Sequence, residues 1–105
     1  MPDEAAAMTA DAAASGAEDI SLADRRDIAW RTIASGSFDC GLAVKASGLN
    51  YVEAGRMFNV WALICGRYPK EMLAEATWQE AQQLRDLNKS YWKAEAAITE
   101  WRQRQ

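Results

Sequence analysis

The sequence predicts an all-α protein, and three features of it support this prediction. Half of the 105 residues are hydrophobic, while glycine occurs six times and proline only twice. Apolar residues recur every three or four positions, which is the spacing that places them on one face of a helix. Residues that cap helices stand before several of these apolar stretches. We expect a helix-turn-helix-like helical corner followed by a C-terminal helical, coiled-coil-like segment.

The first 19 residues differ in composition from the rest of the chain. They contain five acidic residues, no lysine or arginine, and almost no apolar residue larger than alanine. Such a segment cannot bury enough surface to offset the entropy lost on ordering, so residues 1–19 are predicted to be a disordered, acidic, alanine-rich tail. Of the 15 acidic residues ten then remain against 12 bases, and residues 20–105 carry a net charge of +2. Weak contact with nucleic acid by this part is therefore compatible with an acidic protein.

The first helix is expected to begin after Ser21, because Ser21 and Asp24 have the spacing of a capping-box variant. Its end is expected at the Ala-Ser-Gly stretch of residues 34–36. Four residues form its predicted apolar face: Leu22, Ala29, Trp30 and Ile33.

Two further helices are predicted over residues 39–47 and 51–65, with Asp39 as the N-cap of the first. The second half of the later helix reads MFNVWALIC, which is apolar almost all round. A helix with this pattern is buried on several sides. We therefore expect only the first half of this helix to be open to a ligand such as a DNA duplex.

The turn between these two helices has a specific chemistry. Gly48 stands where a left-handed residue ends a helix, a conformation that glycine adopts without a steric penalty. Asn50 is the predicted N-cap of the next helix, and Glu53 has the spacing to complete a capping box. Ala43 and Ala54 flank the turn and allow the two backbones to approach closely. The sequence therefore predicts a tight corner.

The C-terminal part predicts a short helix after Pro69 and a longer helix from about Trp78. Thr77 and Glu80 repeat the capping-box spacing at the start of the longer helix. Along this helix six residues alternate three and four positions apart and form a seam, which requires a partner helix: Leu84, Leu87, Tyr91, Ala94, Ile98 and Trp101. The partner is either a helix of the same domain or a copy in another subunit. A kink in the Leu-Asn-Lys-Ser stretch is left open.

Three segments are therefore expected: the tail (residues 1–19), a helix-turn-helix-like three-helix unit (20–67) and a helical oligomerisation segment (68–105). Trp78 and Trp92 lie two heptads apart on a second face of the last helix. Two apolar faces exceed what one antiparallel neighbour covers, so the pattern favours self-association.

Enzyme chemistry and metal binding find little support in the sequence. There is no histidine, which removes the usual general base near neutral pH and the commonest metal ligand. Cys40 and Cys65 lack the spacing of a zinc site and are interpreted as buried free thiols. The carboxylates fall on helix caps or solvent faces, and no phosphate-binding loop, nucleophile elbow or HExxH motif occurs. We expect a non-enzymatic protein without a metal or cofactor.

The glycine turn also has the arrangement of a helix-turn-helix, in which the second helix enters the major groove by its N-terminal residues. Four side chains would then contact bases or phosphates: Lys45, Asn50, Tyr51 and Arg56. Three arginines of the first helix could add phosphate contacts: Arg25, Arg26 and Arg31. The alternative is a structural corner without a ligand, which is common in all-α folds.

The stretch FDCGLAVKASGLNYVEAGRMF resembles the N-terminal segment of phage small terminase subunits, which often reads Asn-Ala-Thr-x-Ala-Ala-x-x-Ala-Gly-Tyr-Ser before a second helix. The matching positions are Asp39, Cys40, Ala43, Gly48, Leu49, Asn50 and Ala54. The stretch covers about a fifth of the chain, and it departs from the pattern at Val44, where the family has alanine. Phage-like gene transfer agents carry a similar packaging subunit. The resemblance implies an oligomeric ring that holds DNA and hands it to a large terminase ATPase subunit.

Two functions follow as hypotheses. The first is a small-terminase-like DNA-packaging subunit, a homo-oligomer with weak, largely sequence-independent DNA contact and a large terminase subunit as its partner. The second is a small phage or mobile-element adaptor or inhibitor that binds a protein through its Trp and Leu seam, without nucleic acid. No apolar run approaches the roughly 20 residues needed to span a membrane, and no signal-peptide pattern occurs, so a cytoplasmic setting without membrane contact is expected.

Overall fold

Six helices make up the part of the chain that this computed structural model describes, residues 20–36 and 39–105. They are α3 (Leu22–Ala34), α4 (Cys40–Ser47), α5 (Tyr51–Ile64), α6 (Lys70–Glu75), α7 (Trp78–Leu87) and α8 (Tyr91–Gln103). No strand occurs among the described residues, so the all-α prediction is confirmed. The predicted tail, residues 1–19, lies outside the described residues.

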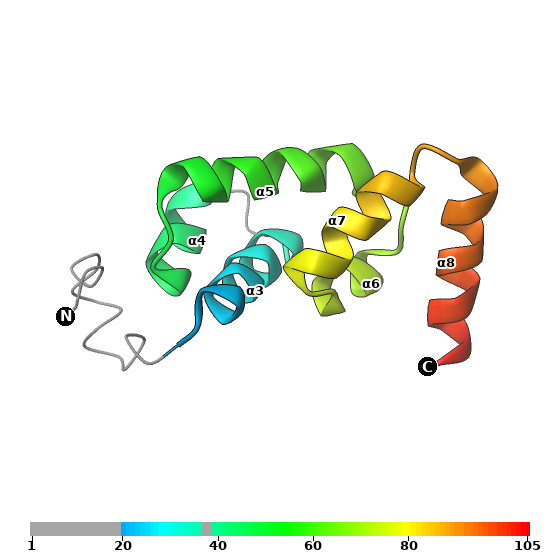
Figure 1. The fold of residues 1–105 in the computed structure, drawn as a ribbon, viewed down its shortest axis with the longest axis horizontal. Coiled ribbons are helices and arrows are strands. Elements are labelled where there is room, and N and C mark those ends of the chain that lie inside the picture. Colours follow the sequence, from blue (N-terminus) through cyan, green and yellow to red (C-terminus); the bar gives the residue numbers. More distant parts are fainter. Residues whose placement is uncertain (1–19, 37–38) are drawn as a thin grey trace.

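The helices are arranged along one long axis (Figure 1). Helix α5 runs along one long edge, α3 and α4 lie toward one end, α6 and α7 lie near the middle, and α8 stands at the other end. Helix α3 packs against α4, α5, α6 and α7, whereas α8 packs mainly against α7. Many helix–helix contacts therefore stabilise the centre of the molecule, whereas few stabilise its C-terminal end.

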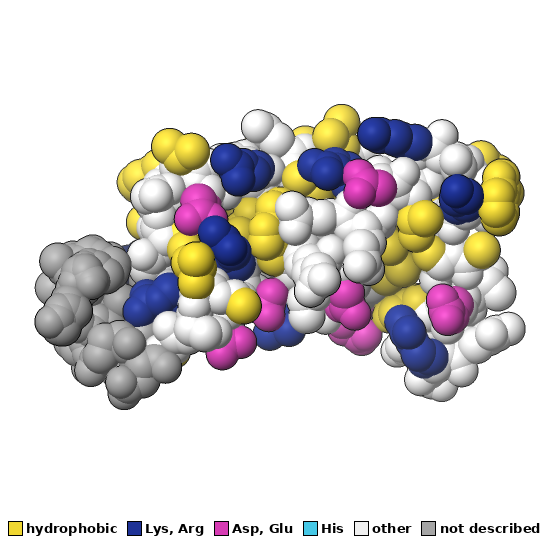
Figure 2. Space-filling view, in the orientation of Figure 1, with side chains coloured by type: hydrophobic (Ala, Val, Ile, Leu, Met, Phe, Trp, Pro, Cys, Tyr) yellow, Lys and Arg dark blue, Asp and Glu magenta, His cyan; other side chains and the backbone are white. Residues whose placement is uncertain are grey.

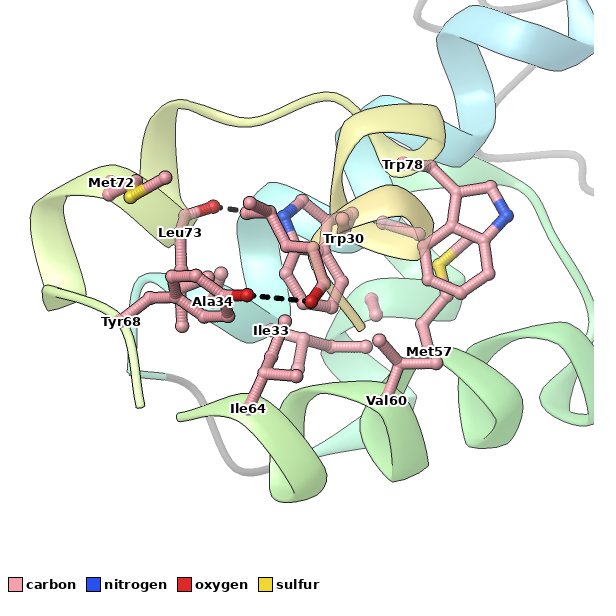
Figure 3. Packing of buried hydrophobic residues seen from close by; sticks show 14 of the residues in the cluster. Trp30, Ile33, Ala34, Met57, Val60, Ile64, Tyr68, Met72, Leu73 and Trp78 are labelled. Carbon is pink, nitrogen blue, oxygen red and sulfur yellow. Dashed lines mark hydrogen bonds between the residues drawn. The ribbon is translucent and has the colours of Figure 1, made fainter. Parts of the chain in front are cut away.

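Trp30 of α3 lies at the centre of the core. Its side chain is fully buried, and its indole Nε1 donates a hydrogen bond of 2.9 Å to the carbonyl oxygen of Leu73 (Figure 3). The rings of Trp30 and Trp78 pack with their centroids 5.8 Å apart. Tyr68 closes the core from the α5–α6 connection, and its hydroxyl donates to the carbonyl oxygen of Leu84 at 2.8 Å. One core therefore connects the predicted three-helix unit with the C-terminal segment.

The predicted helix caps are present in the structure. At each, the cap side chain accepts a hydrogen bond from a backbone N–H two or three residues later: Ser21, Asp39, Asn50 and Thr77. Thr77 and Glu80 complete the reciprocal capping box. Glu53 does not reach back to the backbone of Asn50, because its carboxylate pairs with Arg26 of α3 at 3.0 Å. A contact between helices has replaced the expected local one.

Some predicted burial was wrong. Leu22 is 51% exposed, because it lies in the first turn of α3, where the helix emerges from the core. Leu63 is 64% exposed, and Cys65 is also exposed, so the second half of α5 is not covered on several sides. Helix α5 buries one stripe, Ala54, Met57, Val60 and Ile64, and Phe58 and Trp61 pack against the core beside it while partly exposed. Cys40 is only partly buried.

The helix predicted from Trp78 onward is two helices, because α7 ends at Leu87 and α8 begins at Tyr91. Asn88 is still helical, with φ −60° and ψ −16°, whereas Ser90 is extended, with φ −125° and ψ 116°. Helix α8 then turns back beside α7 (Figure 1). The kink left open by the sequence is a full break between two helices.

Candidate nucleic-acid interface

The turn between α4 and α5 is held by backbone and side-chain hydrogen bonds. Gly48 is left-handed, with φ 80°, and its N–H donates to the carbonyl oxygen of Val44 at 2.8 Å. The buried hydroxyl of Ser47 donates to the carbonyl oxygen of Ala43 at 2.6 Å and accepts from the N–H of Leu49 at 3.1 Å. The sequence-based prediction did not include this role of Ser47. A serine directly before the glycine that ends a helix could have indicated it. The turn is a well-specified corner.

Small residues bring the two helices close together at this corner. Ala43 and Ala54 are both fully buried. A Cβ added to Gly41 would lie 3.0 Å from Oδ1 of Asp39 and 3.2 Å from the hydroxyl of Tyr51. The Tyr51 ring therefore extends back to the first turn of α4, where only a small residue leaves room for its hydroxyl.

The four side chains predicted to contact DNA are all exposed: Lys45, Asn50, Tyr51 and Arg56. Lys45 lies in the last turn of α4, and Arg56 lies in the first half of α5. Neither forms an ion pair or a side-chain hydrogen bond with another described residue. The Asn50 side-chain carbonyl caps α5, so its amide NH₂ is the group left for a ligand. The corner thus carries two cations available to an external anion.

The arginines of α3 are used differently. Arg26 is paired with Glu53 of α5, and Arg25 donates through Nη1 to the carbonyl oxygen of Ser47 at 3.1 Å. Both side chains connect α3 to the corner. Arg31 is exposed at the other end of α3. A phosphate would therefore compete with the protein's own contacts at Arg25 and Arg26.

Helix α5 has an exposed outer stripe that the sequence analysis did not assign. Val52 is 72% exposed, and Arg56, Asn59 and Leu63 follow at four, three and four residues. Residues with this spacing lie on one helix face. Asn59 follows Arg56 by three residues, so helical spacing could have indicated it. Its side-chain amide adds hydrogen-bonding capacity next to the guanidinium group of Arg56.

A groove of about 410 Å³ adjoins this face between α3, α5 and α7. Its charged lining residues are two arginines and two acids: Arg26, Arg56, Asp27 and Glu53. The Asp27 carboxylate accepts from the backbone N–H of Trp78 at 2.9 Å and so fixes the start of α7. Figure 2 shows basic, acidic and hydrophobic side chains interspersed over this face. The electrostatic potential in the groove is therefore neither uniformly positive nor uniformly negative. Among the described residues that line the groove, Arg56 is the cation without an ion-pair partner.

The predicted oligomerisation residues lie mostly inside the chain. Leu84, Ala94 and Ile98 are buried, and Leu87 and Trp101 pack against the same cluster. Tyr91 is 66% exposed. Most of the seam is therefore covered within the chain by the core cluster, and Trp101 Nε1 also donates to Oε1 of Glu75 in α6 at 3.0 Å. Among the described residues no group of three or more His, Cys, Asp or Glu could hold a metal ion.

Comparisons with protein-family models, with curated proteins and with solved structures find no match to this chain. No helix within the described residues is long and apolar enough to cross a membrane.

Proposed function

We propose that this protein binds duplex DNA weakly through the corner formed by α4 and α5. The observation that carries the proposal is the pair of free cations, Lys45 and Arg56, on either side of a turn fixed by Gly48. In a helix-turn-helix these positions face the DNA backbone, and the first turns of the second helix approach the groove. Asn50 and Asn59 add amide groups that can donate to phosphates or base edges.

The binding is expected to be mostly electrostatic. The net charge of residues 20–105 is only +2, and two of the arginines in α3 are engaged within the protein. Few phosphates can therefore be neutralised, and release of their counterions dominates the affinity. The exposed face of α5 also carries Val52 and Leu63, which leaves little capacity for base-specific hydrogen bonds.

We further propose a small-terminase-like role in DNA packaging for this corner. Copies of the chain would assemble through their C-terminal helices, hold DNA, and hand it to the ATPase of a large terminase subunit. This part of the proposal is supported by the resemblance of residues 38–58 to the N-terminal segment of that family. The protein itself supplies binding and position, without catalysis.

A second candidate is an adaptor or inhibitor that binds a protein and not DNA. The observation that favours it is the set of exposed aromatic and aliphatic side chains at the far end of the molecule. Trp92 is 68% exposed, Tyr91 66% and Leu63 64%. Tyrosine and tryptophan are enriched in the central residues of protein interfaces.

Fluorescence anisotropy with a short labelled duplex, measured over a series of salt concentrations, distinguishes the two. The test variant is Lys45→Ala/Arg56→Ala. The control variant is Lys70→Ala/Arg102→Ala, which removes the same charge from exposed positions on α6 and α8. If each corner cation meets one phosphate, the test variant should lower the slope of log affinity against log salt by about 1.8, and the control should barely change it.

Equal loss in both variants would mean that binding depends on overall charge and not on the corner. No binding by the parent protein at low salt would reject the DNA function and favour the protein-binding adaptor.

A further inference from the structure

The seam of α7 and α8 keeps its three-four alternation across the point at which the helix breaks. Leu87 and Tyr91 are four residues apart, and the pattern continues without a skip to Trp101. A continuous helix over this stretch would present all six seam residues on one face. In the closed arrangement Tyr91 is instead left 66% exposed. The sequence pattern therefore suits a straight helix better than the hairpin.

The break is held locally by two backbone hydrogen bonds and by no side-chain cap: the N–H of Lys89 donates to the carbonyl oxygen of Asp86 at 3.2 Å, and the N–H of Ser90 to that of Leu87 at 2.9 Å. Asn88 already has helical dihedral angles, and Ser90 departs from them. The Ser90 side chain makes no capping hydrogen bond, so no side chain satisfies the first N–H groups of α8. In a continuous helix the N–H groups of residues 91–93 would donate to the carbonyl groups of residues 87–89. The Leu87 carbonyl now accepts from the N–H of Ser90 at 2.9 Å, and that bond would move to the carbonyl of Asp86. Straightening the chain at residues 88–90 therefore adds backbone hydrogen bonds.

We propose that α8 is exchanged between two copies of this chain. In the exchanged dimer α7 and α8 of each copy form one helix, and the two long helices pair antiparallel along the seam. With Tyr91 at the two-fold axis, Leu84 lies opposite Ile98 of the second copy, and Leu87 lies opposite Glu95, next to Ala94. The closed chain holds Leu84, Leu87, Ala94 and Ile98 in one cluster. Exchange replaces the packing of α8 against α7 within one chain by packing of α8 against α7 of the second copy, which makes it a low-cost route to a dimer.

Arg67, in the connection between α5 and α6, opposes the exchange. Its Nε donates to Oδ1 of Asn88 at 3.3 Å, and its guanidinium carbon lies 4.6 Å from the centre of the Tyr91 ring. Its Nη1 also lies 3.7 Å from a carboxylate oxygen of Glu95. These contacts lie on both sides of the break and hold the hairpin closed. Trp101 Nε1 of α8 also donates to Oε1 of Glu75 in α6 at 3.0 Å. The balance between the closed and exchanged forms is set by these contacts against the backbone hydrogen bonds gained on straightening.

The proposal rests on the self-assembly part of the proposed function and is independent of DNA binding. A proline at position 91 tests it in the full chain. Tyr91 is the first residue of α8, where proline is favoured, and Ser90 has the extended dihedral angles that a residue before proline prefers. Tyr91→Pro therefore fits the closed form. It cannot fit the interior of a continuous helix, where proline removes a hydrogen bond and clashes with the preceding turn.

The measurement is molar mass by light scattering over a concentration series, with far-UV circular dichroism to check folding. We expect a concentration-dependent dimer for the parent chain. Tyr91→Pro should weaken the dimer by roughly 100-fold or more, while Tyr91→Ala, which removes the ring but not the helix, should still dimerise. Arg67→Ala should strengthen the dimer, and Arg102→Ala, an exposed cation of α8, should not.

Mixing isotope-labelled and unlabelled parent chains supplies a direct readout. Exchange predicts intermolecular NMR contacts between the methyl groups of Leu84 in one copy and Ile98 in the other. A dimer of unchanged strength in Tyr91→Pro, or one that lacks these contacts, overturns the exchange but leaves self-assembly by another surface. A parent chain and an Arg67→Ala chain that both stay monomeric at millimolar concentration overturn the exchange and the assembly together. Loss of folding in Tyr91→Pro would itself show that the closed form does not accept proline, and the Arg67→Ala and NMR results then decide.

Discussion

Two tryptophans represent two regions of this molecule that are built differently. Trp30, in the central region of α3, α5, α6 and α7, is fully buried and hydrogen-bonded to the backbone of Leu73. Trp92, in the terminal helix α8, is 68% exposed, with the amino group of Lys93 5.4 Å from the centre of its ring. Helices α3, α5 and α7 each pack against several others, whereas α6 packs mainly against α3, and α8 mainly against α7. Stability is therefore concentrated in the centre, and the capacity to change partners lies at the end.

The starts of α7 and α8 differ in the same sense, although α6 of the central region also starts without a side-chain cap, after Pro69. Within the central region, α7 begins with a complete capping box of Thr77 and Glu80, and the Asp27 carboxylate of α3 adds a further acceptor. Helix α8 begins at an uncapped Ser90. A helix whose N–H groups are satisfied locally has a fixed start, and an uncapped helix can merge with its neighbour at little cost.

Replacing the two tryptophans should give the largest contrast in stability. Trp30→Ala removes a fully buried ring and its hydrogen bond to Leu73, so the free energy of unfolding should fall by about 3–5 kcal/mol. Trp92→Ala removes an exposed ring and should change it by less than about 0.5 kcal/mol. Urea denaturation followed by circular dichroism measures both. Similar losses in the two variants would mean that α8 is as firmly integrated as the centre.

Much of the fold could be predicted because its signals are local. Ser21, Asp39, Asn50 and Thr77 mark four helix starts, and each bonds to an N–H within three residues. The break before α8 could not be predicted, because part of what holds it comes from Arg67, about 20 residues earlier in the chain. Contacts between distant residues have no short-range pattern in a sequence.

The candidate interface also has one part that could be predicted from the sequence and another that could not. The turn at Gly48 follows from residue type, since its left-handed conformation suits glycine. The pairing of Arg26 with Glu53 could not be anticipated, because it depends on how α3 packs against α5. Which arginines remain free for a ligand is therefore a property of the tertiary structure. Helical spacing would have indicated the outer stripe of α5, but not how far Leu63 is exposed.

Two glycines test whether the corner belongs to the rigid centre. Gly48→Ala places a Cβ at φ 80°, so it should lower the free energy of unfolding by about 1–2 kcal/mol. Gly66→Ala is the matched control, because its backbone is not left-handed and an added Cβ meets nothing within 4 Å. The control should be neutral or slightly stabilising. Equal effects of the two alanines in thermal denaturation would contradict a turn that requires glycine.

Tyr68 gives the central region a dependence on alkaline pH. Burial raises the pKa of Tyr68 above its ordinary value near 10, although the neighbouring Arg67 lowers it in part. The folded state thus favours the neutral phenol, whose hydroxyl donates to Leu84. This stability is fully present below about pH 10 and is lost as pH rises through the folded-state pKa, because the unfolded chain releases the proton first.

The corresponding variant is Tyr68→Phe. It should lower the free energy of unfolding at neutral pH by about 0.5–1.5 kcal/mol, the net contribution of a typical hydrogen bond. The Leu84 carbonyl keeps its helical bond from the N–H of Asn88, so no acceptor is left bare. The decline of stability above pH 10 should be shallower in the variant than in the parent. A decline equally steep in both would assign the alkaline sensitivity to other groups.

The smallest effect is expected from ion pairs, and it should still distinguish the two regions. Arg26 and Glu53 join α3 to α5 at 3.0 Å, with the Glu53 side chain 23% exposed. Arg67 and Glu95 join the α5–α6 connection to α8 at 3.7 Å, with the Glu95 side chain 46% exposed. Exposed pairs typically contribute about 0.2–1 kcal/mol, less when solvent and salt screen them. Double-mutant cycles with alanine at low salt should therefore give the larger coupling energy for Arg26 and Glu53. A larger coupling energy for Arg67 and Glu95 would mean that α8 is held more strongly than its few contacts suggest. Exchange of α8 between copies would then be slower than expected for a weakly held helix.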